Sequence, residues 1–379
     1  MKLLYFVNSL TNSGGIERIL VDKVNYLAAL PECPYEIHIA YYGKECEIPF
    51  YRLNSAIRLH SIDMNGRTAS FSRRIMTVPT LYHHMRRIIK EVKPDVIINE
   101  SMKLVSYILP FTFKHIPRIY VIHFSYEGLI IMDKESFHNS FKQYVMMWLR
   151  KSLLKKYDRF VVLTEHDRKR WNAKTVEVIP NFTNFVEQVP SNLNHKKAIC
   201  VGRLTHQKDM PMLIRAWKLV VEEEPEWILD IWGSGNEYES LKSLIGETGL
   251  EKHVFLKGTS QRIEAEYNQA SLFVLSSRYE GFALVLLEAM NAGLPCVSFD
   301  IPGCNNLISD GDNGIIAKER TTECLANSIL KYIRLGKEEK LRMQSNALTT
   351  VAKYSKERVM QMWIQLFETL HAQYKSGNC

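Results

Sequence analysis

Short apolar runs alternate along this chain with longer stretches in which apolar residues recur at helical spacing. Strands that alternate with helices in this way indicate a mostly parallel, doubly wound α/β sheet. The pattern predicts a first domain over residues 1–182. Its seven strands are expected at 3–7, 36–41, 57–60, 95–98, 118–122, 160–163 and 176–179.

Residues 180–197 are rich in Asn and Pro and lack periodicity, which is typical of an interdomain linker. After it the pattern restarts and predicts a second α/β domain over 195–357. A final helix is expected at about 358–379. Its apolar residues recur at helical spacing and must pack against another part of the protein, for which the first domain is the candidate. The strands of the second domain are expected at 198–201, 228–232, 254–256, 272–276, 295–299 and 315–317.

Composition and length agree with this division, since 379 residues with 46% hydrophobic and 24% charged residues suit a globular protein of two domains. The seven cysteines are scattered without a C-x-x-C pair, so neither a disulfide framework nor a zinc site is expected. The first ten residues have too short an apolar run for a signal peptide and are interpreted as a strand. No apolar run approaches the roughly 20 residues that span a bilayer. The scattered cysteines fit a reducing compartment best, and a cytoplasmic location is therefore expected.

The formal net charge is +8, and the basic excess lies in the first half of the chain. Such a surface favours an anionic partner. Residues 71–93 and 141–159 are predicted to be basic amphipathic helices, suited either to an anionic membrane or to packing on the sheet with a solvated basic face. Nucleic acid is disfavoured, because no recognised binding signature accompanies the charge.

Polar and glycine-containing segments follow several predicted strands, and the carboxyl ends of parallel strands share one edge of a sheet. In the first domain Gly14 and Gly15 open a helix after the first strand. In the second domain, the planar guanidinium of Arg203 and the flexible ammonium group of Lys208 are suited to bind a diphosphate. This convergence predicts an anion site, with Gly202, Gly233, Gly235, Thr259, Ser260 and residues 276–282 around it.

Two glutamates flank the apolar run 283–287. If the helix begins near Phe282, Glu288 lies almost two turns inside it while Glu280 stays in the loop, so the two need not act as an acid and base pair. Each can accept hydrogen bonds from hydroxyl groups, as sugar recognition requires. A pair of unrelated surface carboxylates is the alternative, and the apolar run argues against it.

The segments GGIER, GRLTHQKD, WGSGNEYESLKSL, SSRYEGFALVLLEAMNAGLP and DGDNG occur in this order. Together they resemble the group 1 (family 4) retaining glycosyltransferases, weakly in the first domain and strongly over 198–317. The resemblance implies the GT-B fold, in which two Rossmann-like domains face a central cleft. It also implies transfer of a hexosyl group, with retention, from a nucleotide-diphosphate sugar such as a UDP-sugar to a hydroxyl of a saccharide or lipid-linked acceptor.

By motif position the resemblance assigns Arg203 and Lys208 to the diphosphate, Glu288 to the ribose hydroxyls and Glu280 to the donor sugar. His123, after a predicted strand, matches a family histidine beside the transferred sugar. Gly14 and Gly15 would close on the diphosphate from the first domain. The other donor-binding positions are Gly202, Gly233, Gly235, Gly281, Phe282, Ala283 and Leu284.

Departures from the family pattern occur at Ser277, Ala283 and Asn306, where many members have proline, glycine and glutamate. Residues 310–312 spell D-x-D, which we interpret as a turn, since the family resembled generally needs no metal ion. The family also implies bacterial surface polysaccharide or lipopolysaccharide synthesis at the inner face of the cell membrane.

Two other functions are compatible with a nucleotide site. A non-catalytic nucleotide-sugar sensor or scaffold would bind a donor without transfer. A Rossmann dehydrogenase is disfavoured, because residues 12–15 do not supply G-x-G-x-x-G and no suitable acidic residue stands at the ribose position.

Overall fold

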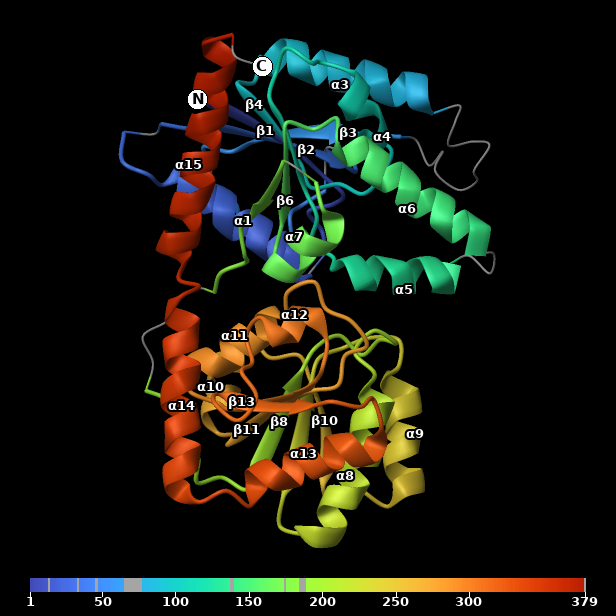
Figure 1. Ribbon diagram of the computed structural model, residues 1–379, viewed down its shortest axis with the longest axis vertical. Coiled ribbons are helices and arrows are strands. Elements are labelled where there is room, and N and C mark those ends of the chain that lie inside the picture. Colours follow the sequence, from blue (N-terminus) through green and yellow to red (C-terminus); the bar gives the residue numbers. More distant parts are fainter. Residues whose placement is uncertain are drawn as a thin grey trace. The chain divides into compact units, whose positions relative to one another are not determined.

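The computed structural model describes residues 1–12, 14–32, 34–44, 47–64, 77–136, 140–173, 175–183 and 189–377. The chain divides into two compact units, each shown in Figure 1. Unit 1 comprises Met1–Tyr126, Met132–Asn181 and Val359–Cys379, and unit 2 comprises Glu127–Ile131 and Phe182–Arg358. The predicted linker therefore falls where the chain passes from unit 1 to unit 2, and residues 184–188 of it lie outside the described residues.

Unit 1 contains a parallel sheet of seven strands in the order β3-β2-β1-β4-β5-β6-β7. The chain starts at the centre with β1 and builds outward on one side before it crosses to β4, which makes a doubly wound sheet with its switch point between β1 and β4. The strands are β1 (Lys2–Val7), β2 (Glu36–Tyr42), β3 (Arg58–Ile62), β4 (Val96–Asn99), β5 (Arg118–Val121), β6 (Arg159–Val162) and β7 (Val176–Val178).

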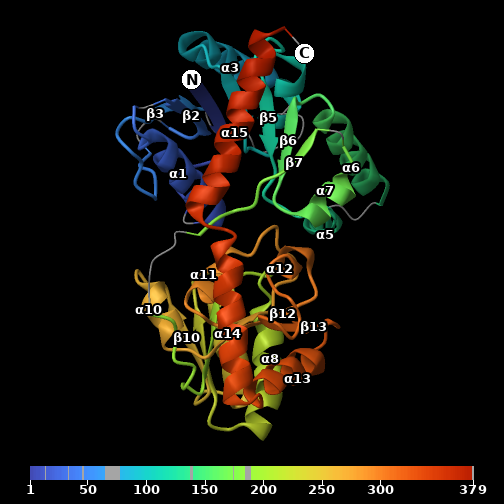
Figure 2. The same cartoon turned by 60° about the vertical axis from the view of Figure 1, so that its left-hand side comes forward.

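Helices connect these strands, and the last helix of the chain also belongs to this unit. On α15 Trp363 and Phe367 are buried, and Phe367 meets Tyr35 with ring centroids 6.4 Å apart. The predicted final helix therefore packs on unit 1, where Figures 1 and 2 show α15 in red. The helices are α1 (Gly15–Ala28), α3 (Val78–Val92), α4 (Val105–Ile108), the 3-10 turn η1 (Leu109–Phe111), α5 (Tyr126–Ser136), α6 (Ser140–Leu154), α7 (Glu165–Trp171) and α15 (Lys356–Lys375).

Unit 2 contains a parallel sheet of six strands in the order β10-β9-β8-β11-β12-β13. Its first strand is again central, so the switch point lies between β8 and β11. Both sheets thus have the order of a Rossmann-like fold. The strands are β8 (Lys197–Val201), β9 (Ile228–Trp232), β10 (Val254–Gly258), β11 (Leu272–Leu275), β12 (Cys296–Phe299) and β13 (Gly314–Ala317).

The helices of unit 2 bury their apolar faces against the sheet and against each other. Helix α8 packs against α9 and α13, which Figure 1 shows beside it, and α11 packs against α14. The helices are α8 (Met210–Glu223), α9 (Tyr238–Thr248), α10 (Ile263–Asn268), α11 (Leu284–Asn291), α12 (Pro302–Asn305), α13 (Thr322–Ile333) and α14 (Lys337–Ala352).

All thirteen predicted strands are present within one or two residues of the expected limits, and the α/β fold class is confirmed. Two predicted helices need correction. The basic helix predicted over 141–159 ends at Leu154, because Arg159 already begins β6. The one predicted over 71–93 is described from Val78, and residues 71–76 lie outside the described residues.

Within the described ranges, Cys200, Cys296, Cys304 and Cys324 are free thiols, whereas Cys33, Cys46 and Cys379 fall outside these ranges. No described helix combines the length and the apolar composition that crossing a bilayer requires.

Candidate functional site

Two loops meet at the switch point of unit 2, one after β8 and one after β11. The Arg278 amide donates to the carbonyl of Gln207 at 2.8 Å, and the Gln207 side chain donates to the carbonyl of Tyr279 at 3.1 Å. The Ser276 hydroxyl donates to the carbonyl of Lys208 at 2.8 Å. The loops that carry the predicted diphosphate and sugar residues are therefore joined into one surface at the carboxyl edge of the sheet.

Lys208 and Glu280 form an ion pair within this surface. Lys208 Nζ lies 2.6 Å from Glu280 Oε1, and the side chains are 12% and 8% exposed. Ser277 Oγ donates to the same carboxylate oxygen at 2.6 Å. The two residues that the sequence assigned to different parts of a donor thus contact each other. Ser277, which lies in the predicted segment 276–282 but was given no role of its own, takes part in this contact.

Arg203 differs from Lys208 in its surroundings. It is exposed, and in the part of the chain that the structure describes its guanidinium makes no ion pair or hydrogen bond. A guanidinium on this edge keeps its five donors for a ligand. The site therefore offers one positive charge that is already neutralised and one that is open to an incoming anion.

The glycines of the next loop allow the strand ends to approach closely. Gly233 adopts a φ of +142°, and a Cβ there would come within 1.8 Å of the Gly202 carbonyl oxygen. A Cβ on Gly235 would lie 2.2 Å from the carbonyl oxygen of Leu204. Both contacts are with backbone, so neither position accepts a larger residue without a shift of the loop. Gly202, Gly233 and Gly235 bring the loops after β8 and β9 together.

Helix α11 starts at Leu284, two residues later than expected, so Glu288 is its fifth residue and lies little more than one turn inside it. Tyr267 on α10 donates its hydroxyl to Glu288 Oε2 at 3.2 Å. Burial, reinforced by the Glu288 charge, raises the pKa of Tyr267 well above its ordinary value, so the hydroxyl remains a donor. Glu280 and Glu288 have different partners and do not form a pair.

The turn before α11 presents backbone toward the edge of the sheet. Phe282 is buried and meets Tyr354 with ring centroids 5.5 Å apart, so its side chain belongs to the core of unit 2. Ala283 is buried at the N-cap position of the helix, with Gly281 before it and Leu284 after it. A Cβ on Gly303, in the short helix α12, would lie 2.4 Å from the Glu280 carbonyl oxygen, so this glycine also shapes the turn.

Arg320 and Asp209 support the site and were not predicted. The Arg320 guanidinium donates to the carbonyls of Ser277 at 2.8 Å and Ser276 at 3.0 Å and to Asp209 Oδ2 at 2.6 Å. Arg278 also pairs with Asp209, at 3.2 Å. Arg320 lies between β13 and α13, after the last predicted motif, and nothing in the local sequence indicates that it reaches back to the loop after β11.

Thr259 and Ser260 follow β10 in unit 2, where the Ser260 hydroxyl accepts from the Arg262 amide at 3.0 Å. The other predicted residues lie in unit 1. Gly14 is the N-cap of α1 and Gly15 its first residue, so the expected strand, glycine turn and helix are present. His123 follows β5, and its Nε2 lies 3.1 Å from Glu100 Oε2. Glu100, which follows β4, also pairs with the buried Lys23 of α1. Neither Glu100 nor Lys23 carried a signal in the sequence analysis.

The D-x-D sequence forms a turn, as interpreted. Gly311 adopts a φ of +79°, Asp310 Oδ1 accepts from the amide of Ile316 at 3.0 Å, and Asp312 Oδ1 accepts from Asn346 at 2.7 Å. Within the described ranges, no three His, Cys, Asp or Glu side chains gather where they could hold a metal ion.

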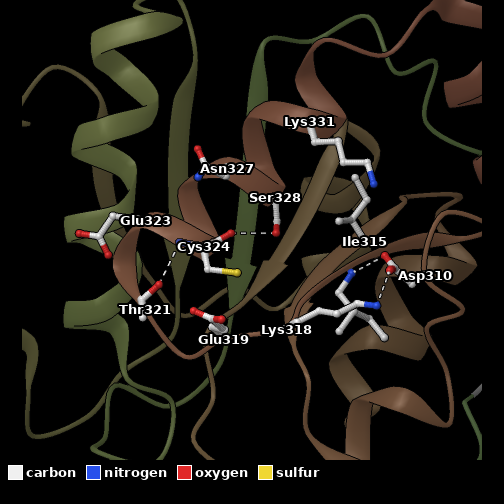
Figure 3. A pocket seen from close by; sticks show the side chains of 11 residues that line it. Asp310, Ile315, Lys318, Glu319, Thr321, Glu323, Cys324, Asn327, Ser328 and Lys331 are labelled. Carbon is white, nitrogen blue, oxygen red and sulfur yellow. Dashed lines mark hydrogen bonds and ion pairs between the residues drawn. The ribbon is translucent and has the colours of Figure 1, made fainter.

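A separate pocket of about 450 Å³ lies against β13 and α13 (Figure 3). Its polar groups interact with each other: Ser328 donates to the Cys324 carbonyl at 2.8 Å, and Lys318 Nζ lies 3.8 Å from Asp310 Oδ2. None of the predicted donor-binding residues lines it. The candidate site is therefore the surface formed by the loops at the switch point of unit 2.

Two Rossmann-like units with polar loops at the switch points are the architecture of GT-B glycosyltransferases, and the family comparisons assign the chain to that class. Residues 181–350 match the family described as glycosyl transferases group 1, and residues 13–185 match the one described as glycosyltransferase family 4. The chain belongs to the group 1 glycosyltransferases and is an enzyme of that class.

Relatives over almost the full length carry related names. A protein of Haemophilus influenzae described as an uncharacterized glycosyltransferase is 25% identical over 368 residues, which cover 96% of this chain and 98% of the relative. The amylovoran biosynthesis glycosyltransferase AmsD of Erwinia amylovora is 26% identical over 380 residues, with 96% and 98% covered.

Solved structures share the fold. Sucrose-phosphate synthase from Thermosynechococcus elongatus superposes with a TM-score of 0.81 at 18% identity and covers 98% of this chain and 99% of its own. The lipopolysaccharide outer core galactosyltransferase WaaB gives 0.72 at 18% identity, with both chains fully covered. Anabaena HepE in complex with UDP gives 0.75 at 18% identity, with 97% and 100% covered.

Proposed function

We propose that this enzyme transfers a sugar, with retention, from a UDP-sugar to a hydroxyl of a saccharide or lipid-linked acceptor in bacterial surface polysaccharide synthesis. The observation that carries the proposal is the surface on unit 2 where Arg203 stands open to an anion beside the Lys208–Glu280 pair. A nucleotide diphosphate needs cationic donors, and a sugar needs acceptors for its hydroxyls. This surface supplies both next to each other.

The diphosphate is the leaving group of such a reaction, and negative charge grows on it as the glycosidic bond breaks. Arg203 and Lys208 would stabilise that charge through hydrogen bonds that strengthen in the transition state. With two cationic side chains available, the proposed reaction uses no metal ion. Departure and attack on the same face of the sugar would retain the anomeric configuration and need no obligatory protein base.

Glu288 suits the nucleoside end of the donor. Tyr267 fixes the carboxylate from one side, and α11 holds it near the carboxyl edge of the sheet. A carboxylate in this position accepts hydrogen bonds from a pair of neighbouring hydroxyls, such as those of ribose. The choice of UDP is supported by HepE, a protein of the same fold whose structure was solved in complex with UDP.

The surface-polysaccharide assignment is supported by the names of two relatives by fold or sequence, the amylovoran enzyme AmsD and the lipopolysaccharide enzyme WaaB. The test is a panel of nucleotide sugars scored for thermal stabilisation, since a donor at 100 times its dissociation constant adds about 2.7 kcal/mol. Stabilising donors are then incubated with saccharide acceptors and membrane extracts, and the anomeric configuration of the product is read by NMR.

We expect UDP-sugars to stabilise the protein and one of them to be consumed with retention. Binding without turnover of any donor would instead favour the non-catalytic sensor or scaffold. An inverted product would overturn the retaining mechanism but leave the transferase class intact.

We further propose that unit 1 contacts an anionic membrane surface through α3 and α6. On α6 Tyr144 and Trp148, one turn apart, are 70% and 59% exposed. Exposed aromatic side chains on a helix that also carries exposed lysines are typical of a surface that lies at the interface of a bilayer. On α3 the exposed Arg86, Arg87 and Lys90 add about 1 kcal/mol each near anionic lipid.

Liposome co-sedimentation tests this contact. The variant Tyr144→Ser/Trp148→Ser and the variant Arg86→Glu/Arg87→Glu/Lys90→Glu should each bind vesicles with anionic lipid more weakly than the wild type. The matched control is Lys337→Glu/Arg342→Glu/Lys353→Glu in unit 2, which reverses three exposed positive charges, as the variant on α3 does. Equal binding of all four proteins would remove the membrane proposal without affecting the donor site.

A further inference from the structure

Two histidines on neighbouring strands of unit 1 share a hydrogen bond. His38 of β2 is buried, and its Nδ1 lies 2.9 Å from Nε2 of the half-buried His60 of β3. The ring centroids are 5.2 Å apart and the ring planes differ by 27°, so the two nitrogens face each other nearly in one plane. In the parallel register His60 pairs with Ala40, two residues beyond His38, so both rings lie on the same face of the sheet.

Glu36 fixes the direction of this hydrogen bond. Burial would raise the pKa of Glu36, but its hydrogen bond with His38 and the charges of Lys2 and Arg58 lower it, so the carboxylate is ionised at neutral pH. An ionised carboxylate only accepts hydrogen bonds. His38 Nε2, which lies 3.1 Å from Glu36 Oε1, must therefore donate. In a neutral ring Nδ1 is then an acceptor, so His60 donates to it from Nε2.

A first and a second proton affect this histidine pair differently. Burial lowers the pKa of His38 and the pKa of His60 below the ordinary value of about 6.5, so the neutral rings predominate at pH 7. One added proton leaves the hydrogen bond intact, because one of the two facing nitrogens still accepts. A second proton places two N–H donors and two positive charges against each other. The pair therefore loses its hydrogen bond when both rings are charged.

The charged surroundings do not compensate for the second proton. Charged groups face the two rings from β1, β2, β3 and α3: Lys2, Glu36, Arg58, Arg87 and Glu91. Glu36 is already paired with Lys2 at 3.5 Å and with Arg58 at 3.1 Å. These groups together supply no net negative charge to hold two protonated rings side by side.

We propose that the hydrogen bond between His38 and His60 is a latch that holds β3 on β2 at neutral pH and is released in acid, when both rings take up protons. β3 is the strand that responds, since it has five residues and lies at the edge of the described sheet. Because α3 packs on β3, release also removes part of the support of the helix that we propose contacts the membrane.

The direction of the pH dependence follows from the two states of the latch. An opened strand exposes both histidines to water, where they titrate at the ordinary pKa of about 6.5. Their pKa is lower in the closed state, so opening takes up protons and the open population grows as the pH falls below about 6.5.

Hydrogen exchange of the full-length protein tests the latch, since opening of β3 exposes its amides. Each proton taken up changes the opening equilibrium by up to about tenfold per pH unit. After correction for the intrinsic rate, we expect exchange of Arg58–Ile62 to rise about 10- to 100-fold between pH 7 and pH 5. The amides of β1, at the centre of the sheet, should stay protected.

His60→Gln removes one titrating ring and keeps a hydrogen-bonding group in its place. The amide can donate to neutral His38 through its NH₂ or accept from protonated His38 through its oxygen. A proton on His38 then leaves the contact closed, so exchange of β3 should change less than about threefold over the same pH range.

Glu36→Gln should act in the opposite direction and make the rise steeper. It keeps an acceptor for His38 Nε2 but removes a negative charge that favours the protonated rings. The Glu36 side chain is 34% exposed, so this variant also decides the question if His60→Gln does not fold.

The matched control is His115→Gln, which replaces an exposed histidine of unit 1 and should keep the wild-type profile. Exchange of β3 that is independent of pH in the wild type, the same rise in His60→Gln, or a smaller rise in Glu36→Gln would each overturn the latch. An equal rise for β1 would mean that the whole unit unfolds and that the pair has no local role. Hydrogen exchange needs no donor, so the result stands whether or not the protein transfers a sugar.

Discussion

Lys208 Nζ lies 2.6 Å from Glu280 Oε1, so a residue predicted to hold a diphosphate is paired with one predicted to read the sugar. In the proposed reaction an incoming diphosphate would compete with Glu280 for the ammonium group. Binding of the donor would then free the Glu280 carboxylate to accept hydrogen bonds from the sugar hydroxyls.

Removal of Lys208 should affect both stability and catalysis. Lys208→Met leaves the 8%-exposed Glu280 side chain with the Ser277 hydroxyl and without its cation, an arrangement that disfavours a buried carboxylate. We expect a lower melting temperature and a loss of transfer of about 10²- to 10³-fold in kcat. Arg203→Ala is the matched comparison: exposed and unpaired among the described groups, it should lose turnover to a similar extent at an unchanged melting temperature. Near-normal turnover in both would remove these residues from the site.

The approach between the loops after β8 and β9 depends on Gly233. In Gly233→Ala the new methyl group would meet the Gly202 carbonyl oxygen at 1.8 Å. Backbone strain and the clash together should lower the free energy of unfolding by about 3 kcal/mol or more. Gly249→Ala is the control, because φ is also positive there, at +71°, but nothing lies within 4 Å. It should cost about 1 kcal/mol in the same urea titration; equal costs would mean that the close approach is unimportant.

Arg320 links the loop after β11 to Asp209, and its loss should loosen the turn that carries Glu280. For Arg320→Ala we expect a loss of about 1 to 3 kcal/mol, as for hydrogen bonds to charged groups, together with weaker donor binding. Arg334→Ala removes an arginine whose pair with Glu223 is about half exposed, and should leave both quantities unchanged. Calorimetry and donor titration of the two variants check this. Unchanged donor affinity in Arg320→Ala would show that the turn keeps its shape without the link.

The pKa of Glu100 predicts how stability depends on pH. Burial opposes ionisation, but Lys23 and His123 lower the pKa from 4.5 to about 2 in the folded protein. The pair therefore stabilises the fold fully above about pH 4.5, and this contribution is lost as the pH falls toward 2. Urea unfolding between pH 5 and 2.5 should show a shallower decline in Lys23→Met/Glu100→Gln than in the wild type. Parallel curves would contradict the lowered pKa.

Tyr267→Phe removes the hydroxyl that holds Glu288 and keeps the buried ring. We expect a several-fold rise in KM for the donor with kcat less affected, since the contact orients a group that reads the nucleoside. Steady-state kinetics with the donor found in the panel measure this, and Tyr332→Phe, which loses a buried hydroxyl bonded to the Ser271 carbonyl, is the control. A fall in kcat with unchanged KM would place Glu288 at the reacting sugar instead.

The sequence was sufficient for the sheets because buried central strands of a parallel sheet leave contiguous apolar runs along the chain. The edge strands β3 and β7 are less buried and less apolar, and the alternation of strands and helices indicated them. The start of α11 was misplaced because the turn 281–283 is as apolar as the helix, so periodicity alone gives no boundary. Lys208 and Glu280 were selected singly, yet their contact joins residues 72 positions apart in the chain.

The residues that support the candidate site show more clearly which contacts the sequence does not predict. Arg320 reaches Asp209 across 111 positions, and Lys23 reaches Glu100 across 77. A lysine on an amphipathic helix normally indicates a solvated face, and only the fold reveals that this one is buried under Trp363. Pairings of this kind depend on which strands become neighbours in the sheet. The local pattern of apolar and polar residues does not determine that order.

Because Trp363 and its helix complete unit 1, this unit can finish folding only after the ribosome has synthesised Val359–Cys379. Synthesis of the intervening unit 2 takes roughly 10 to 35 s at ordinary elongation rates. During that interval Lys23 lacks the cover of Trp363, and the surface later buried by α15 is open to chaperones and proteases. A nascent chain that stalls before Val359 would carry a finished unit 2 behind an unfinished unit 1, the reverse of the usual order in which domains mature.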